Sequence, residues 1–417
     1  MKTSWFIAGA IVAIVSSADF SRAGSASSMD AKTLNTLARE ATSANSSQAD
    51  AAIGQLRAAG PLGLDAMFQV YGEQIQARQS IAATKDADWE RLRTALDTIA
   101  QQRDSYASHL YWFTNLDQAK SAARAAGKPI LSLRLLGKLN EEFTCANSRF
   151  SRTTLYPNAQ VSAYLRDHFI LHWQSVRPVP RITIDMGDGR RIERTITGNS
   201  IHYILDSDGN PIDALPGLYG PKAFLAELDR AVAAEQQASK FSGAERARFL
   251  ADYHAARFVE IQKQWSSDLA KIGETSVPAP ETVDSEAIWQ KIASLHGAEA
   301  VLDAGSVKLI ESKQPPTAAE AARLTLSKMA IETPMIRMLR NLQRSIAEDT
   351  VRNEYQLHSR IHQWFARGVA PAQLDALNSK VYAELFLTPN SDPWLGLAPA
   401  DIYSALDGGG LVQNTLK

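Results

Sequence analysis

The chain has 417 residues and a formal net charge of −1, with 45% hydrophobic and 21% charged residues. This composition is typical of a globular protein, and the length suggests two or three domains. Because the charge is nearly balanced, we expect neither nucleic acid nor an anionic membrane surface as a partner.

The N-terminus has the pattern of a secretory signal. Lys2 precedes an apolar run at positions 5–15, which is shorter than the roughly 20 residues of a membrane-spanning helix. Small residues follow, so we predict a signal peptide at residues 1–18 and a mature chain that begins at Asp19. An uncleaved membrane anchor is the alternative, which the short run disfavours. We expect an exported protein with no membrane span after signal cleavage, located in the periplasm of a Gram-negative source and otherwise secreted.

Residues 29–105 are predicted to form a helical region, because their apolar residues recur at spacings of three and four. Two of the helices flank a turn at Gly60 and Pro61, as in a HEAT-type helical repeat. A single pair does not establish an array. We therefore favour a small helical bundle packed on its neighbour.

The pattern changes over residues 106–235. A helix is expected to begin after Asn115, a good N-cap residue, and to end at Gly127. Beyond it, apolar strands alternate with helices, and the region closes with hairpins and a helix. We predict an α/β domain with a mixed sheet flanked by helices, placed between an N-terminal and a C-terminal mostly helical region.

The order of these elements resembles the thioredoxin-like superfamily, in particular exported thioredoxin-domain proteins. The resemblance covers residues 106–235 and includes a Gly-Lys-Pro stretch at 127–129, a buried strand, a cysteine at a helix start and a closing hairpin and helix. It implies a thioredoxin-like fold. It also places Cys145, the only cysteine of the chain, at the family's nucleophilic position.

Three residues depart from the family pattern. Ser148 replaces the second cysteine of the Cys-x-x-Cys motif, Ser200 stands at the cis-proline position, and Thr144 stands where a tryptophan usually precedes the nucleophile. A serine hydroxyl can donate a hydrogen bond to a thiolate but cannot resolve a mixed disulfide. These differences argue against a general dithiol reductase.

The position of Cys145 favours a thiolate on physical grounds, since unpaired N–H groups and the helix dipole face a residue at a helix start. Arg149 would add to this effect, and we expect Thr144, Arg149 and Ser200 to line the site around Cys145 and Ser148. A buried, inert thiol is the structural alternative.

Two functions follow from these alternatives. The first is monothiol thiol–disulfide exchange, or isomerase-like activity, on protein substrates through Cys145. The second is a non-catalytic protein-binding or scaffold protein with a redox-inactive thioredoxin fold. Both imply a protein partner, and neither implies a cofactor.

An insertion at residues 177–200 separates the second strand from Ser200. Its isoleucines alternate with charged residues, which is typical of a hairpin. We favour a hairpin that covers the sheet edge, and the alternative is a wall of a binding groove beside the thiol.

Residues 237–417 are predicted to be mostly helical. Glu354, His358 and His362 are spaced by four and so share one helix face, as metal ligands can. No further ligand cluster is evident in the sequence, so we favour a solvated or packed helix face and predict no metal. The tail around Trp394 is expected to pack onto the helices, with partner binding as the alternative.

Overall fold

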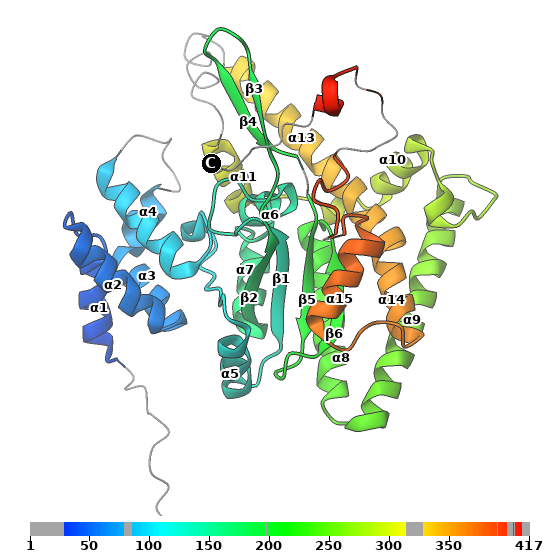
Figure 1. Ribbon diagram of the computed structural model, residues 1–417, viewed down its shortest axis with the longest axis horizontal. Coiled ribbons are helices and arrows are strands. Elements are labelled where there is room, and N and C mark those ends of the chain that lie inside the picture. Colours follow the sequence, from blue (N-terminus) through cyan, green and yellow to red (C-terminus); the bar gives the residue numbers. More distant parts are fainter. Residues whose placement is uncertain are drawn as a thin grey trace, which may run out of the picture.

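The computed structural model describes residues 29–78, 86–196, 198–313, 328–389, 391–397, 403 and 405–410 (Figure 1). The predicted signal peptide and its cleavage site lie outside these ranges. Within them, no helix combines the length and the apolarity that a bilayer crossing requires.

Four helices form a bundle at one side of the molecule (Figure 1). They are α1 (Ala31–Glu40), α2 (Ser46–Ala58), α3 (Pro61–Arg78) and α4 (Ala87–Ala100). The bundle has its own apolar core, to which Leu56, Met67 and Leu96 contribute fully buried side chains. A 3₁₀ turn, η1 (Ser105–Ala107), leads from it toward the sheet.

The predicted α/β architecture with a mixed sheet and flanking helices is confirmed. The sheet contains β1 (Ile130–Leu136), β2 (Ile170–Arg177), β5 (Ser200–Leu205) and β6 (Pro211–Pro216). Their order is β2-β1-β5-β6, with β1 parallel to β2 and β5 antiparallel to both β1 and β6. Every residue of β1 is buried, as expected for a central strand covered on both faces.

The helix before the sheet, α5 (Leu116–Ala126), has the ends that the sequence predicts. The side chain of Asn115 accepts a hydrogen bond of 2.9 Å from the backbone N–H of Gln118, which caps the first turn. Gly127 ends the helix with a φ of 61°, a left-handed conformation that glycine adopts without strain.

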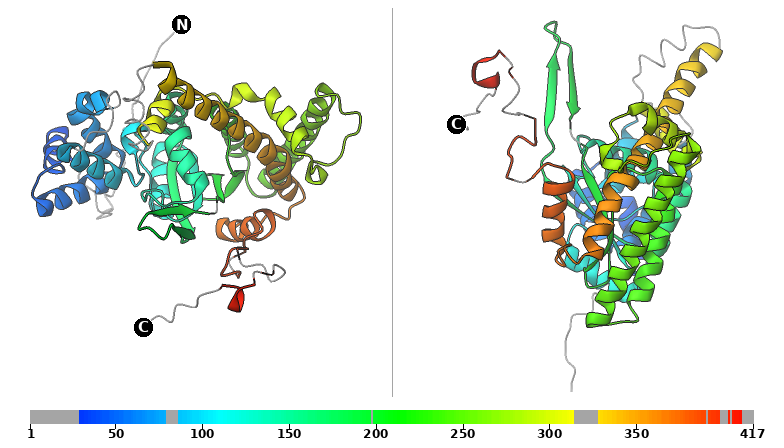
Figure 2. Two further views of the ribbon diagram at one scale, coloured as in Figure 1. Left: turned by 90° about the horizontal axis from the view of Figure 1, so that it is seen from above. Right: turned by 90° about the vertical axis from the view of Figure 1, so that its right-hand side faces the viewer.

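Helices from distant parts of the chain cover the two faces of the sheet (Figure 2). One face packs against α6 (Ala146–Phe150), the π-helical turn η2 (Ser151–Leu155), α7 (Ala159–His168) and α8 (Pro221–Ala238). The other face packs against α5, α14 (Ser359–Ala366), α15 (Leu374–Lys380) and the π-helical turn η6 (Val381–Leu385). The C-terminal region therefore completes the core of the α/β domain.

The rest of the C-terminal region has a core around Trp265, Trp289 and Tyr355. Its helices are α9 (Gly243–Lys271), α10 (Glu286–Leu295), α11 (Ala304–Ser312) and α13 (Lys328–Arg352), with the π-helical turn η5 (Asn353–His358) and the 3₁₀ turns η3 (Pro280–Thr282), η4 (Gly297–Glu299) and η7 (Asp407–Gly410). The backbone stays helical from α13 through η5 into α14.

The insertion forms a hairpin of β3 (Arg181–Asp185) and β4 (Arg191–Thr195), which projects from the body of the molecule (Figures 1 and 2). The predicted hairpin is confirmed, and among the described residues its strands pair with each other and with no strand of the main sheet. All of β3 and most of β4 are exposed. The root of the hairpin nevertheless lies beside Cys145, because the hydroxyl of Thr195 donates to the backbone oxygen of Thr144 at 3.2 Å.

Candidate functional site

Cys145 lies at the N-cap of α6, directly after the loop that follows β1. Its backbone N–H donates to the oxygen of Leu136 at 3.1 Å, which fixes the start of the helix against the end of the strand. Its Sγ lies 3.0 Å from the hydroxyl oxygen of Ser148, one helical turn on. The structure thus brings together the cysteine and the serine of the Cys-x-x-Ser motif.

The thiol is completely buried, with an exposed fraction of 0%. The backbone oxygen of Asn199 lies 3.8 Å from Sγ and also accepts a hydrogen bond of 3.2 Å from the hydroxyl of Tyr382. Tyr382 belongs to η6, more than 200 residues further along the chain, and lies in the same buried core cluster as Cys145. A reagent in solution cannot reach Cys145 in this arrangement.

The chain after η6 is hydrogen-bonded to Arg177 and Asn199. Thr388 accepts hydrogen bonds from Asn199 through its hydroxyl and from Arg177 through its carbonyl, at 3.2 and 3.0 Å. Arg177 also donates to the carbonyl of Asp392 at 3.2 Å. The tail therefore packs onto the end of β2 and the approach to β5, and Trp394 beyond it is 44% exposed.

The other predicted site residues lie around the thiol. Arg149 donates to the carbonyl of Thr144 at 3.0 Å and to the hydroxyl of Thr195. Thr144 is buried, and its hydroxyl donates to the backbone oxygen of Leu136 at 3.2 Å. Ser200 is buried as the first residue of β5, and its hydroxyl has no hydrogen-bond partner among the described residues.

A second group of buried ionisable residues lies at the edge strand β6, where α8, α9, η5 and α14 meet. It divides into two sets, each of which could hold a metal ion because its ligand atoms lie within 4.8 Å of one another. The first set is Asp213, His254 and His362, and the second is Glu227, Glu354 and His358.

In the first set, two imidazoles face each other beside a carboxylate. His254 Nδ1 lies 2.7 Å from His362 Nδ1, and His254 Nε2 lies 3.0 Å from the backbone oxygen of Ile212. Asp213 accepts a hydrogen bond of 2.9 Å from the hydroxyl of Tyr253. All three residues of the set are at most 2% exposed.

The second set is held by a guanidinium. Arg257 donates to Glu227 at 3.0 Å and to Glu354 at 3.5 Å, and its side chain is 8% exposed. His358 Nδ1 lies 2.9 Å from Glu354, and its Nε2 lies 3.4 Å from Asp213, which links the two sets.

The protonation states of the first set follow from burial and from these neighbours. Burial opposes ionisation of Asp213, but the imidazoles of His362 and His358 hold its pKa well below the ordinary value. Burial lowers the pKa of His254 and His362. In the first set, the surroundings therefore favour the ionised form of the carboxylate and burial disfavours the charged form of the two imidazoles.

In the second set, Arg257 and His358 lie against the carboxylates of Glu227 and Glu354. Burial alone would lower the pKa of His358, but the carboxylates of Glu354 and Asp213 raise it to about 10. Burial and the neighbouring Glu354 raise the pKa of Glu227 to about 7. Glu354 keeps a lowered pKa, because His358 and Arg257 outweigh the effect of burial.

The sequence analysis identified three of the six residues of this group. Glu354, His358 and His362 do lie along one packed helix face, but Glu354 and His358 belong to the second set and His362 to the first. Sequence reasoning missed Asp213, Glu227 and His254. The available signal was in α9, where His254 and Arg257 lie on the same buried stripe as Ile261 and Trp265.

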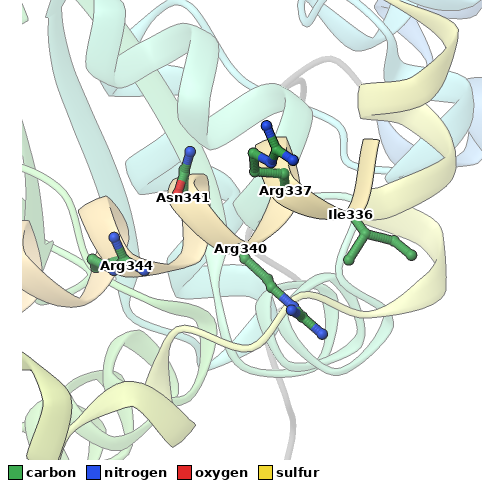
Figure 3. A pocket seen from close by; sticks show the side chains of 5 residues that line it. All are labelled: Ile336, Arg337, Arg340, Asn341 and Arg344. Carbon is green, nitrogen blue, oxygen red and sulfur yellow. The ribbon is translucent and has the colours of Figure 1, made fainter. Parts of the chain in front are cut away.

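The face of α13 near its N-terminal end contains a shallow hollow lined by Ile336, Arg337, Arg340, Asn341 and Arg344 (Figure 3). The arginines are spaced by three and four residues and so share one helix face. The hollow includes no residue of the Cys145 site or of the group at β6, so it adds nothing to the chemistry of either.

Comparisons of the chain with protein-family models, with curated proteins and with solved structures found no match.

Proposed function

We propose that the protein is an exported protein-binding protein in which a thioredoxin-like domain serves as a scaffold and Cys145 is structural. The observation that carries the proposal is the complete burial of Cys145. Thiol–disulfide exchange requires the thiolate to approach another sulfur directly, which a covered sulfur cannot do. A thiol in such surroundings acts as a small apolar side chain.

The thioredoxin-like part of the proposal has its support in the order of the elements. A helix, a buried strand, a cysteine at a helix start, a second strand parallel to the first, an antiparallel hairpin and a closing helix follow one another along residues 116–238. This is the order on which the resemblance of the sequence rests. The inserted hairpin β3–β4 is the feature that departs from it.

The binding element is the projecting hairpin. Five large apolar side chains on it are between 37% and 53% exposed: Ile182, Ile184, Met186, Ile192 and Ile196. Ile184 lies opposite Ile192 in the register. Because side chains alternate across a strand, Ile182, Ile184 and Ile192 lie on one face, where Arg194 stands opposite Ile182. Contiguous apolar patches of a few hundred Å² on a soluble protein mark interaction sites.

Among the residues that the structure describes, the contacts of the hairpin with the body lie at its root, which supports a role in reaching a partner. Arg181 stacks on the ring of Phe143 at 4.6 Å, and Thr195 bonds to Thr144. A two-stranded hairpin with no further packing is only marginally stable in water. A partner protein that covers the isoleucine face would bury this apolar area and order the hairpin.

Site-specific photocrosslinking tests this proposal. A photoreactive amino acid at position 184 should give one dominant protein adduct in the exported protein, because Ile184 lies on the apolar face. The matched control is position 183, since the side chain of Thr183 points to the opposite face of the same strand. Equal adducts at both positions, or none at either, would contradict the binding role.

The structural role of Cys145 has its own test. In the folded chain, an aromatic disulfide reagent should react with Cys145 at least a hundredfold more slowly than with a free model thiol, and equally fast after unfolding in urea. A folded-state rate equal to that of the model thiol would exclude a structural thiol.

Monothiol exchange is the second candidate, favoured by the 3.0 Å contact between Cys145 Sγ and the Ser148 hydroxyl at the start of α6. It requires the segment after η6 to leave the site. Under this alternative, non-reducing gels of exported protein show high-mass species that vanish in Cys145→Ser. The proposed binding role predicts that the two gels are identical.

A further inference from the structure

We propose that Asp213, His254 and His362 form a binding site for a zinc ion that ties β6, α9 and α14 together. The three side chains come from three separate elements, and each offers one ligand atom within 4.8 Å of the others. The inference is independent of the hairpin and of Cys145.

The hydrogen bonds of His254 show that its free nitrogen faces the set. The backbone oxygen of Ile212 can only accept, so His254 Nε2, 3.0 Å away, carries the proton of a neutral imidazole. Its Nδ1 lone pair therefore points at His362 Nδ1, 2.7 Å away. Histidines that bind metals have this arrangement, in which the second nitrogen donates to a carbonyl or carboxylate and fixes the ring.

The metal-free hydrogen bonding leaves one nitrogen unused. Because His254 Nδ1 has no proton, His362 Nδ1 must donate, which leaves His362 Nε2 as a bare acceptor. That atom has no hydrogen-bond partner among the described residues, although His362 is 0% exposed. Zinc bound at both Nδ1 atoms would move the His362 proton to Nε2, so this nitrogen marks a change of protonation on binding and is not a ligand position.

The carboxylate is also held in position. Asp213 accepts hydrogen bonds from the hydroxyl of Tyr253 at 2.9 Å and from the backbone N–H of Ala214 at 2.8 Å. The ring of His254 stacks on Phe365 with a centroid distance of 4.4 Å. A ligand set with oriented side chains loses little conformational entropy on binding a metal.

The ligand types suit zinc. Two imidazole nitrogens and one carboxylate oxygen are a common zinc set, which non-haem iron(II) sites share, and zinc is the ion that we propose and test. Zinc–nitrogen bonds of about 2.0–2.1 Å place two tetrahedral ligand nitrogens about 3.4 Å apart. The two Nδ1 atoms therefore need to separate by less than about 1 Å for both to bind one zinc ion.

The neighbouring set does not qualify for a metal. Arg257 already places a cation between Glu227 and Glu354, with contacts of 3.0 and 3.5 Å. His358 engages both nitrogens, one with Glu354 and one with Asp213. We therefore assign zinc to the first set alone.

The test uses the full mature chain, purified without a polyhistidine tag and freed of metal by a chelator. Zinc alone is titrated in competition with a chromophoric chelator, and Tm is measured with and without zinc. We expect one zinc per chain and a rise in Tm of several degrees, because a ligand that binds only the folded state stabilises it. Absence of binding at micromolar zinc would overturn the assignment.

Variants separate this site from adventitious binding. His254→Gln and His362→Gln should each lower zinc affinity at least a hundredfold, whereas Glu227→Gln in the neighbouring set and His296→Gln outside both sets should change it less than tenfold. Binding that survives both ligand substitutions would overturn the proposal, as would loss of binding in His296→Gln.

A measurement on the unaltered protein covers the case in which the ligand variants do not fold. X-ray absorption of the zinc-loaded wild-type chain should show two imidazoles and at least one oxygen at about 2.0–2.2 Å. A coordination shell with no imidazole, or with one, would refute the assignment.

Discussion

A buried ion pair joins the N-terminal bundle to the α/β domain, and its removal has a calculable consequence. Asp104 follows α4, Arg152 lies in η2, and each side chain is 1% exposed. The Asp104 carboxylate lies 2.5 Å from Arg152 and 2.6 Å from Lys313 Nζ. Burial works against ionisation of Asp104, but Lys313 and Arg152 keep its pKa below the ordinary value. The aspartate therefore connects all three regions of the chain.

Asp104→Asn removes the charge and keeps the shape. Asp104 has a φ of 60°, which asparagine tolerates as well as aspartate, so the substitution adds no backbone strain. Lys313 is 31% exposed and can return to water, whereas Arg152 would stay buried with the Glu142 carbonyl at 3.1 Å and the Glu142 carboxylate at 3.7 Å as its remaining partners. Breaking a buried pair costs about 3–5 kcal/mol when the remaining charge has no other partner. We expect a loss near the lower end, because Arg152 keeps its contacts with Glu142.

Urea unfolding at pH 7, followed by tryptophan fluorescence, measures the loss. The matched control is Asp208→Asn, because Asp208 and its partner Arg124 are both more than half exposed and the pair is 2.8 Å apart. The control should leave the unfolding midpoint unchanged. If Asp104→Asn costs less than about 1 kcal/mol, as an exposed pair would, the pair is accessible to water and the reasoning fails.

Three further predictions concern other parts of the chain. Hydrogen bonds to Glu299 and to a second carboxylate raise the pKa of His296 from 6.5 to about 9. The contribution of His296 to the free energy of unfolding, up to about 3 kcal/mol, is therefore complete below pH 6.5 and is lost as the pH rises through 9. Denaturation midpoints across that range should show the decline in wild type and not in His296→Gln. Ser148→Cys should form a disulfide with Cys145 on export, because Cys145 Sγ and the Ser148 hydroxyl oxygen are 3.0 Å apart. The intact mass of the variant should then be lower by two hydrogens. A folded variant with two free thiols would contradict the placement. Intact mass of the exported wild type should correspond to cleavage after Ala18, and retention of that segment would refute the signal prediction.

The local elements were determined by the sequence. The ends of α5 follow from Asn115 and Gly127, because a cap hydrogen bond and a left-handed glycine involve residues within one turn of each other. The buried strand β1 follows from its apolar run, and Cys145 was correctly expected at a helix start. These features depend on neighbours a few positions away, so a single sequence contains the information.

Long-range packing decided the rest. Cys145 is buried in a core cluster that includes Tyr382, which no periodicity connects to it. The grouping of Asp213 with His254 and His362 depends on how α9 and α14 pack at the edge of β6, across gaps of 41 and 108 positions. Helical spacing identified only members of one helix, because it describes which residues share a face and not which face they meet. The tertiary structure alone brought the carboxylate and the two imidazoles together.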